Sequence, residues 1–158
     1  MSPQEEALAI ERRRNGQIAN VLLATDLSPV SDGALVEAIS LCRALRARLL
    51  VVNVIDTRQG LGRQLKPVAR EARIDQLRAE REKELIAVVE RARDDGVDAN
   101  FLVWTGEAGQ GIVSAADAEG ADLVVVGTRA LDRAGRFLLG SVSDYVVNNS
   151  PCPVLVAR

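Results

Sequence analysis

The sequence predicts an α/β fold, a single doubly wound domain in which helices cover both faces of a five-stranded parallel sheet. The run at 123–126 is entirely apolar and the run at 49–55 almost so, as in strands that are buried on both faces. Segments with helical periodicity separate such runs, and this alternation favours parallel strands joined by right-handed crossovers. The length of 158 residues suits one domain with one sizeable core.

Polar and glycine-containing segments indicate where each element ends. Residues 1–16 are polar and are expected to form a helical or disordered extension in front of a domain at 17–158. The expected strands are 18–24, 49–55, 100–104, 123–126 and 153–157. The expected helices are one that Ser28 caps and Pro29 begins, a long charged one that ends at Asp94, one from Ile112 to Gly120, and one that opens with Gly140 and Ser141. The connections at 57–70 and 106–111 are expected to be loops.

Composition excludes several classes of function. The chain has 20 Lys and Arg against 22 Asp and Glu, so it lacks the basic surplus that nucleic-acid binding requires. It contains no histidine, which removes Ser-His-Asp and Cys-His catalytic systems and every zinc site that uses histidine. No residue stands out as a dedicated catalytic base, so we expect a binding protein rather than an enzyme.

Two further features predict a cytoplasmic protein that keeps its thiols reduced. The first residues lack the apolar core of a signal peptide, and no later run reaches membrane-spanning length. Cys42 and Cys152 are the two cysteines of the chain, and in such a protein they are expected to be free.

Polar residues and glycines follow the first and fourth strands, where open α/β sheets bind ligands. Thr25 and Asp26 end the first strand, and Gly127 ends the fourth. A strand order that places the first strand beside the fourth brings Asp26 next to Gly127. Asp26 could instead only cap the helix that follows it.

The loop at 127–141 leads into a helix that opens with glycine and serine. Backbone N–H groups and the helix dipole converge at such a start and suit an anion. Gly140 allows close backbone approach, and Ser141 and Ser143 supply hydroxyls. A plain capped helix is the alternative. The other glycine-containing loop, 106–111, matches neither the dinucleotide fingerprint nor a P-loop, so a structural turn is expected there.

The spacing Gly127, two residues, Ala130, nine residues, Gly140-Ser141 resembles the nucleotide-binding pattern of the universal stress protein family. The segments at 20–28, 50–56, 121–127 and 152–156 also resemble the family, so the likeness to a UspA-like domain extends over most of the chain. It implies a Rossmann-like fold of the adenine nucleotide alpha hydrolase type and a homodimer paired through Val154, Leu155 and Val156.

The resemblance also implies a stress-responsive regulatory protein that binds ATP or another adenine nucleotide. Asp26 would lie near the ribose or a Mg²⁺ ion, Val54 would contact adenine through its backbone, and hydroxyls and N–H groups at the helix start would hold phosphates. The implied binding residues are Ala24, Thr25, Asp26, Val54, Gly127, Thr128, Arg129, Ala130, Gly140, Ser141, Val142 and Ser143. Arg133 and Arg136 could add positive charge. Enzymatic activity would be limited to weak ATP hydrolysis.

One position departs from the family pattern, because Ala130 stands where the pattern has glycine. A side chain there would weaken binding if the backbone needs a positive φ or if the methyl group crowds a phosphate. Two alternatives to a nucleotide-binding regulatory protein remain open. One is a member of the family that binds no nucleotide and acts as a dimeric interaction protein. The other is an adenylating enzyme, for which no catalytic side chains are found.

Overall fold

A computed structural model of the chain describes residues 2–58, 61, 65–128, 130–131 and 137–158. The elements in chain order are α1 (Pro3–Arg14), β1 (Asn20–Ala24), the 3₁₀ turn η1 (Pro29–Ser31), α2 (Asp32–Leu45), β2 (Arg48–Asp56), α3 (Pro67–Asp94), β3 (Ala99–Gly106), α4 (Ala108–Ala118), β4 (Leu123–Gly127), β5 (Ala130–Leu131), β6 (Phe137–Leu138), α5 (Ser141–Asn149) and β7 (Val154–Ala157).

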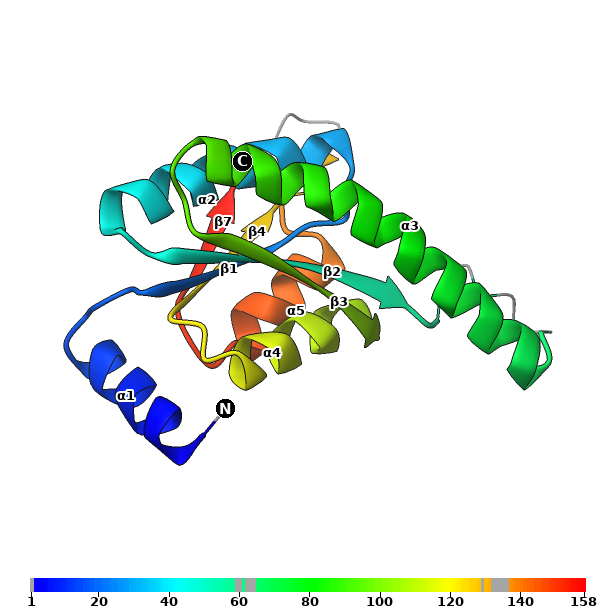
Figure 1. Cartoon of the computed structure of the whole chain (residues 1–158), viewed down its shortest axis with the longest axis horizontal. Helices are drawn as coiled ribbons and strands as arrows, with labels where there is room; N and C mark the ends of the chain where they lie inside the picture. The colour runs from blue at the N-terminus through cyan, green and yellow to red at the C-terminus, as the bar shows by residue number, and fades with distance from the viewer. Residues whose placement is uncertain (1, 59–60, 62–64, 129, 132–136) are drawn as a thin grey trace.

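Five parallel strands form the sheet, in the order β3-β2-β1-β4-β7 (Figure 1). The central strand β1 pairs with β2 through Val21 and Leu49, and with β4 through Val21 and Leu123. The first and fourth strands of the predicted set are therefore neighbours, and the predicted fold class is confirmed. The short strands β5 and β6 form a separate antiparallel pair.

Helices α2 and α3 cover one face of the sheet, and α4 and α5 cover the other (Figure 1). Leu23 belongs to the core under α2 and α3, whereas Leu22 belongs to the core under α4 and α5, and both are 0% exposed. Successive side chains of a strand point to opposite faces. A strand with a core on each side must therefore be apolar at every position, which explains the uninterrupted runs in the sequence.

Three helix starts differ from the expectation. Helix α3 begins at Pro67, so the connection expected at 57–70 ends earlier. Helix α4 begins at Ala108, so the prediction of a loop over 106–111 is wrong for most of its length. Its glycines are packing positions, since a Cβ atom on Gly109 would lie 2.8 Å from Tyr145 Cδ1 and one on Gly111 would lie 2.9 Å from Val54 Cγ1. Helix α2 begins only at Asp32, because the turn η1 comes first.

Residues 3–14 form helix α1, which lies beyond the amino ends of the strands (Figure 1). Its start is a complete capping box, because the Ser2 hydroxyl accepts from Glu5 N–H and the Glu5 carboxylate accepts from Ser2 N–H. The Ser2 bonds hold the Glu5 pKa below its ordinary value. The sequence allowed either a helix or a disordered extension for this segment. The capping box favours the helix, which is what the structure shows.

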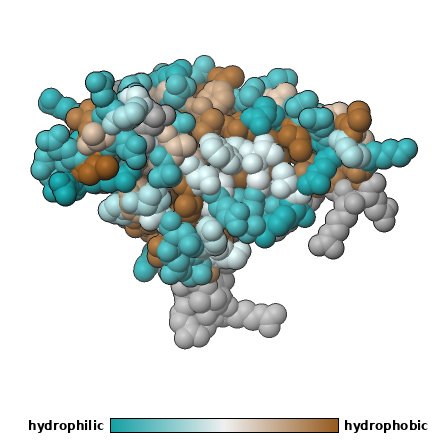
Figure 2. Space-filling model, turned by 90° about the horizontal axis from the view of Figure 1, so that it is seen from below, coloured by the Kyte–Doolittle hydropathy of each residue, from teal (hydrophilic) through white to brown (hydrophobic). Residues whose placement is uncertain are grey.

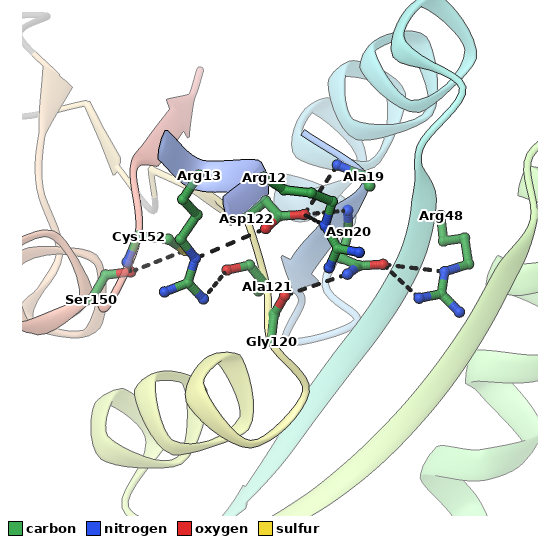
Figure 3. A network of polar contacts seen from close by, with 10 residues as sticks. All are labelled: Arg12, Arg13, Ala19, Asn20, Arg48, Gly120, Ala121, Asp122, Ser150 and Cys152. Carbon is green, nitrogen blue, oxygen red and sulfur yellow. Dashed lines mark hydrogen bonds and ion pairs between the residues drawn. The ribbon is translucent and has the colours of Figure 1, made fainter. Parts of the chain in front are cut away.

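A buried carboxylate ties α1 to the sheet (Figure 3). Asp122, only 2% exposed, accepts hydrogen bonds from the N–H groups of Ala19 at 3.0 Å and Asn20 at 2.9 Å. Its oxygens also lie 3.7 Å from Arg12 Nε and 3.9 Å from Arg13 Nε. Arg13 donates in addition to the Ala121 carbonyl at 2.8 Å. One side chain thus connects α1, β1 and β4.

Both cysteines are free, as predicted from the sequence. Burial raises the pKa of the Cys42 thiol to about 11 and also raises the pKa of Cys152. A raised pKa keeps a thiol protonated at neutral pH and lowers its reactivity. We therefore assign Cys42 to core packing in α2.

Figure 2 shows one side of the surface, where hydrophobic residues form small separate areas between hydrophilic and intermediate ones. Within the described ranges, no helix combines the length and the apolar character needed to cross a membrane. Helix α3 is long but carries charges throughout.

Replacing the buried carboxylate should destabilise the protein. Ala19 and Asn20 both donate to Oδ2, so the remaining oxygen in Asp122→Asn can keep these bonds. The amide nitrogen then replaces the oxygen near Arg13 Nε, and two arginines lose their counter-charge. We expect a loss of about 2–3 kcal/mol in the free energy of unfolding, measured by chemical denaturation. The control Asp117→Asn, exposed on α4, should change stability by less than about 0.5 kcal/mol. Equal effects of the two substitutions would show that the cluster does not stabilise the fold.

Candidate functional site

A cleft of about 210 Å³ opens at the carboxyl ends of β1, β2 and β4, beside the start of α5. Its size suits part of one small molecule. The predicted site residues whose surroundings are described all line it: Ala24, Thr25, Asp26, Val54, Gly127, Thr128, Gly140, Ser141, Val142 and Ser143. Arg129 lies outside the described residues, and so does the side chain of Ala130. The chain leaves β1 towards β2 and returns to β4 on the other side, and this reversal produces the crevice.

The loop after β1 is held by a chain of hydroxyl groups. Ser31 Oγ donates to the Ser28 carbonyl at 2.7 Å, so its contact of 2.9 Å with Thr25 Oγ1 must use the Thr25 hydrogen. Thr25 Oγ1 in turn accepts from Leu27 N–H at 3.0 Å. Leu27 has φ 62°, and this bond helps to hold its left-handed conformation. The Thr25 hydroxyl therefore shapes the loop and has no hydrogen left for a ligand.

Asp26 lines the cleft and also closes the next turn. Its Oδ1 accepts from the backbone N–H of Ser28 at 3.0 Å and from the Ser28 hydroxyl at 2.6 Å. This is an Asx-turn, in which a carboxylate replaces a backbone carbonyl. The bonds occupy Oδ1 and orient the carboxylate at the cleft. The two roles considered from the sequence, turn capping and ligand contact, are compatible in this geometry.

The start of α5 forms the opposite wall. Gly140 is the N-cap with extended backbone, and among the described residues no side-chain hydrogen bond caps the helix. The first N–H groups of α5 and the positive end of its dipole lie at the edge of the cleft, where they favour an anion. Ser143 Oγ donates to the Gly127 carbonyl at 2.9 Å and is almost fully buried. Its hydroxyl joins α5 to β4, while Ser141 is exposed.

Two charged contacts border the cleft near the end of β2. Asp56 lines it, and its Oδ1 accepts from the Arg58 N–H at 2.8 Å. The Arg58 guanidinium lies 2.9 Å from Glu107 Oε1, directly before α4. Sequence reasoning missed the Arg58–Glu107 pair, because the partners are far apart in the chain and only the pairing of β2 with β3 brings them together.

Asn53 is a second residue that the sequence analysis did not assign to the site. It lines the cleft, is 3% exposed, and donates from Nδ2 to the Thr25 carbonyl at 3.0 Å. The sequence does contain a signal for this position, because Asn53 is the one polar residue in the apolar run at 49–55. A polar side chain inside a buried strand requires a partner and thus marks a special position.

Comparison with known proteins gives a consistent result along the chain. The model of the universal stress protein family matches residues 17–158. The universal stress protein YxiE of Bacillus subtilis is 33% identical over 147 residues, covering 87% of this chain and 97% of that protein. A universal stress protein of Thermus aquaticus is 37% identical over 140 residues, with coverages of 87% and 97%. Helix α1 precedes the matched region.

Solved structures show the same architecture. The universal stress protein UspA from Lactobacillus plantarum superposes with a TM-score of 0.76 at 24% identity, covering 90% of this chain and 99% of that one. A universal stress protein crystallised in complex with cAMP has a TM-score of 0.65 at 27% identity, with coverages of 90% and 98%.

The buried hydroxyl between α5 and β4 should contribute to stability. Ser143→Ala removes the donor to the Gly127 carbonyl, so we expect a loss of about 1–2 kcal/mol in the free energy of unfolding. Ser114→Ala on the exposed face of α4 is the matched control and should be nearly neutral. Thermal unfolding followed by circular dichroism gives both values. If the two variants unfold at the same temperature, the Ser143 bond makes no net contribution.

Proposed function

Since the chain belongs to the universal stress protein family, we propose that it is a stress-responsive regulatory protein that binds an adenine nucleotide. The proposed site is the cleft at the carboxyl ends of β1, β2 and β4. One observation carries the proposal: the ends of these strands and the start of α5 converge on a single cleft. Apolar walls for a base and N–H groups for phosphates are thereby combined in one place.

The chemistry of the cleft suits each part of such a ligand. Val54, Ile112 and Val126 supply apolar surface for the adenine. The Asp26 carboxylate can accept from ribose hydroxyls or help to hold a Mg²⁺ ion that phosphates also bind. The N–H groups that follow Gly140 can hold phosphates. The structure solved with cAMP supports an adenine nucleotide as the ligand class, because that protein has the same fold at 27% identity.

Roles for Arg129 and Ala130 in this proposal follow from the resemblance of the loop alone. In this proposal Arg129 adds positive charge near the phosphates, and the alanine weakens binding without abolishing it. The protein acts in the cytoplasm and passes its ligand state to a protein partner. Any hydrolysis of ATP is slow, in keeping with a sensor.

A direct experiment tests nucleotide binding. The purified protein is denatured, and the released small molecules are identified by absorbance and chromatography. Isothermal titration with ATP, ADP, AMP and cAMP follows. We expect a released adenine nucleotide or measurable affinity for at least one of the four. Absence of both would favour the alternative, a dimeric interaction protein that binds no nucleotide.

A charge placed at the start of α5 should weaken binding without harming the fold. In Ser141→Asp, a carboxylate at the first position of α5 interacts favourably with the helix dipole but repels phosphate. We expect roughly 10-fold weaker binding of ATP, and a smaller loss for cAMP because it carries less charge. Asn100→Asp makes the same charge change on β3 near the amino end of the sheet and should leave affinity unchanged. Equal loss in both variants would place the phosphates elsewhere.

We further propose that the protein forms a homodimer through β7. Within the described residues, β7 pairs only with β4, and Val154, Leu155 and Val156 are partly exposed. The carbonyls of Pro153 and Ala157 accept from β4 and the residue after it. Alternation along a strand therefore directs the backbone groups of Val154 and Val156 outwards. An apolar edge with outward N–H groups suits pairing with a second copy.

The dimer is tested with a substitution that affects only this edge. Val156→Pro removes an outward N–H group and leaves the bonds from β7 to β4 in place. We expect the molar mass measured by light scattering to fall from dimer to monomer. The control is Val36→Ala, which changes an exposed valine of α2 and should leave the protein dimeric. Alanine is used there because proline would disrupt the helix. A dimeric Val156→Pro protein would exclude β7 as the contact.

A further inference from the structure

The side chain of Asn53 contains a buried acceptor that has no donor among the described residues. Asn53 lies in β2 on the same face as Val51 and Ile55, which pack under α2 and α3. Its Nδ2 donates to the Thr25 carbonyl at 3.0 Å. A carbonyl can only accept, so this bond fixes which end of the amide is nitrogen. The other end, Oδ1, is buried and has no hydrogen-bond partner among the described residues.

Several donors of the loop after β1 are already engaged in other hydrogen bonds, so they are not available to Asn53 Oδ1. Thr25 N–H donates to the Val52 carbonyl at 3.0 Å, and Leu27 N–H donates to Thr25 Oγ1. Both donors of Ser28 go to Asp26. The hydroxyl hydrogens of Thr25 and Ser31 are also engaged, as described above. An unpaired buried acceptor is unfavourable, and Asn53 lines the cleft, so a bound molecule is the natural source of a donor.

We infer that Asn53 is a specificity-determining residue that accepts a hydrogen bond from the ligand through Oδ1 while Nδ2 holds the loop after β1. The inference rests on the proposed binding of an adenine nucleotide. Such a ligand carries two kinds of donor, the 6-amino group of the base and the hydroxyls of the ribose. A ligand that lacks the donor, or that presents an acceptor at that point, leaves Oδ1 unpaired and binds less tightly.

Ligand analogues identify the donor. Affinities of the wild-type protein are measured by titration calorimetry for AMP, purine riboside 5′-monophosphate without the amino group, 2′-deoxy-AMP and 3′-deoxy-AMP. We expect one of the three analogues to bind roughly 10-fold more weakly than AMP. The weak analogue identifies whether the base or the ribose donates. If all three bind as tightly as AMP, the inference is wrong.

The variant Asn53→Leu connects that preference to this side chain. It has a similar shape but neither amide group, so AMP and the weak analogue should bind with equal affinity. Persistence of the wild-type preference in Asn53→Leu would overturn the inference, even if all ligands bind more weakly because the loop has loosened. Asn100→Leu, an exposed substitution on β3, is the matched control and should keep the wild-type pattern.

A measurement on the wild type covers the case in which Asn53→Leu does not fold. The side-chain carboxamide of Asn53, labelled and observed by NMR, should shift on addition of AMP and shift less with the weak analogue. Identical shifts with both ligands would overturn the inference. If AMP and its analogues do not bind to the wild type at all, both the proposed function and this inference fail. Binding without a preference removes the inference alone.

Discussion

The pairing of β1 with β2 on one side and β4 on the other is the constraint on which both ends of the molecule depend. Leu22 and Leu23 of β1 are fully buried in opposite cores, so the strand cannot shift its register without moving apolar side chains out of both. At the carboxyl end, the chain leaves β1 and β4 towards different sides and opens the cleft. At the amino end, the same pairing brings Asp122 against the N–H groups of Ala19 and Asn20.

Most hydroxyls of the cleft serve its shape rather than a ligand. Thr25 and Ser31 bond within the loop after β1, and Ser143 bonds to Gly127 across 16 residues. These bonds form the walls before any ligand is present, which lowers the entropic cost of binding. In our proposal the groups that contact a ligand include the first N–H groups of α5, the Asp26 carboxylate and the buried Oδ1 of Asn53. Recognition in our proposal therefore depends on few groups held in fixed positions.

Sequence patterns predicted the sheet better than the details of its loops. Alternation of buried runs and helices predicted the parallel sheet, and Thr25, Asp26 and Gly127 lie together at its carboxyl edge, where they line the cleft. The expected loop at 106–111 is wrong because Gly109 and Gly111 lie within α4, where they provide room for Tyr145 and Val54. Such a role depends on a partner from another element and leaves no local signal.

The sequence by itself determined the class of fold, the strands and the edge at which a ligand binds in such sheets. These follow from periodicity and from glycine and polar residues at strand ends, which act locally. The family was indicated by the resemblance of the sequence to the family's motif. Only the tertiary structure decided that α1 is anchored by Arg12 and Arg13 on Asp122 and that Arg58 meets Glu107. It also decided that Asn53 lines the cleft and that its buried Oδ1 has no partner among the described residues. Each of these depends on groups that are distant in the chain, and their partners are set by strand pairing and helix packing.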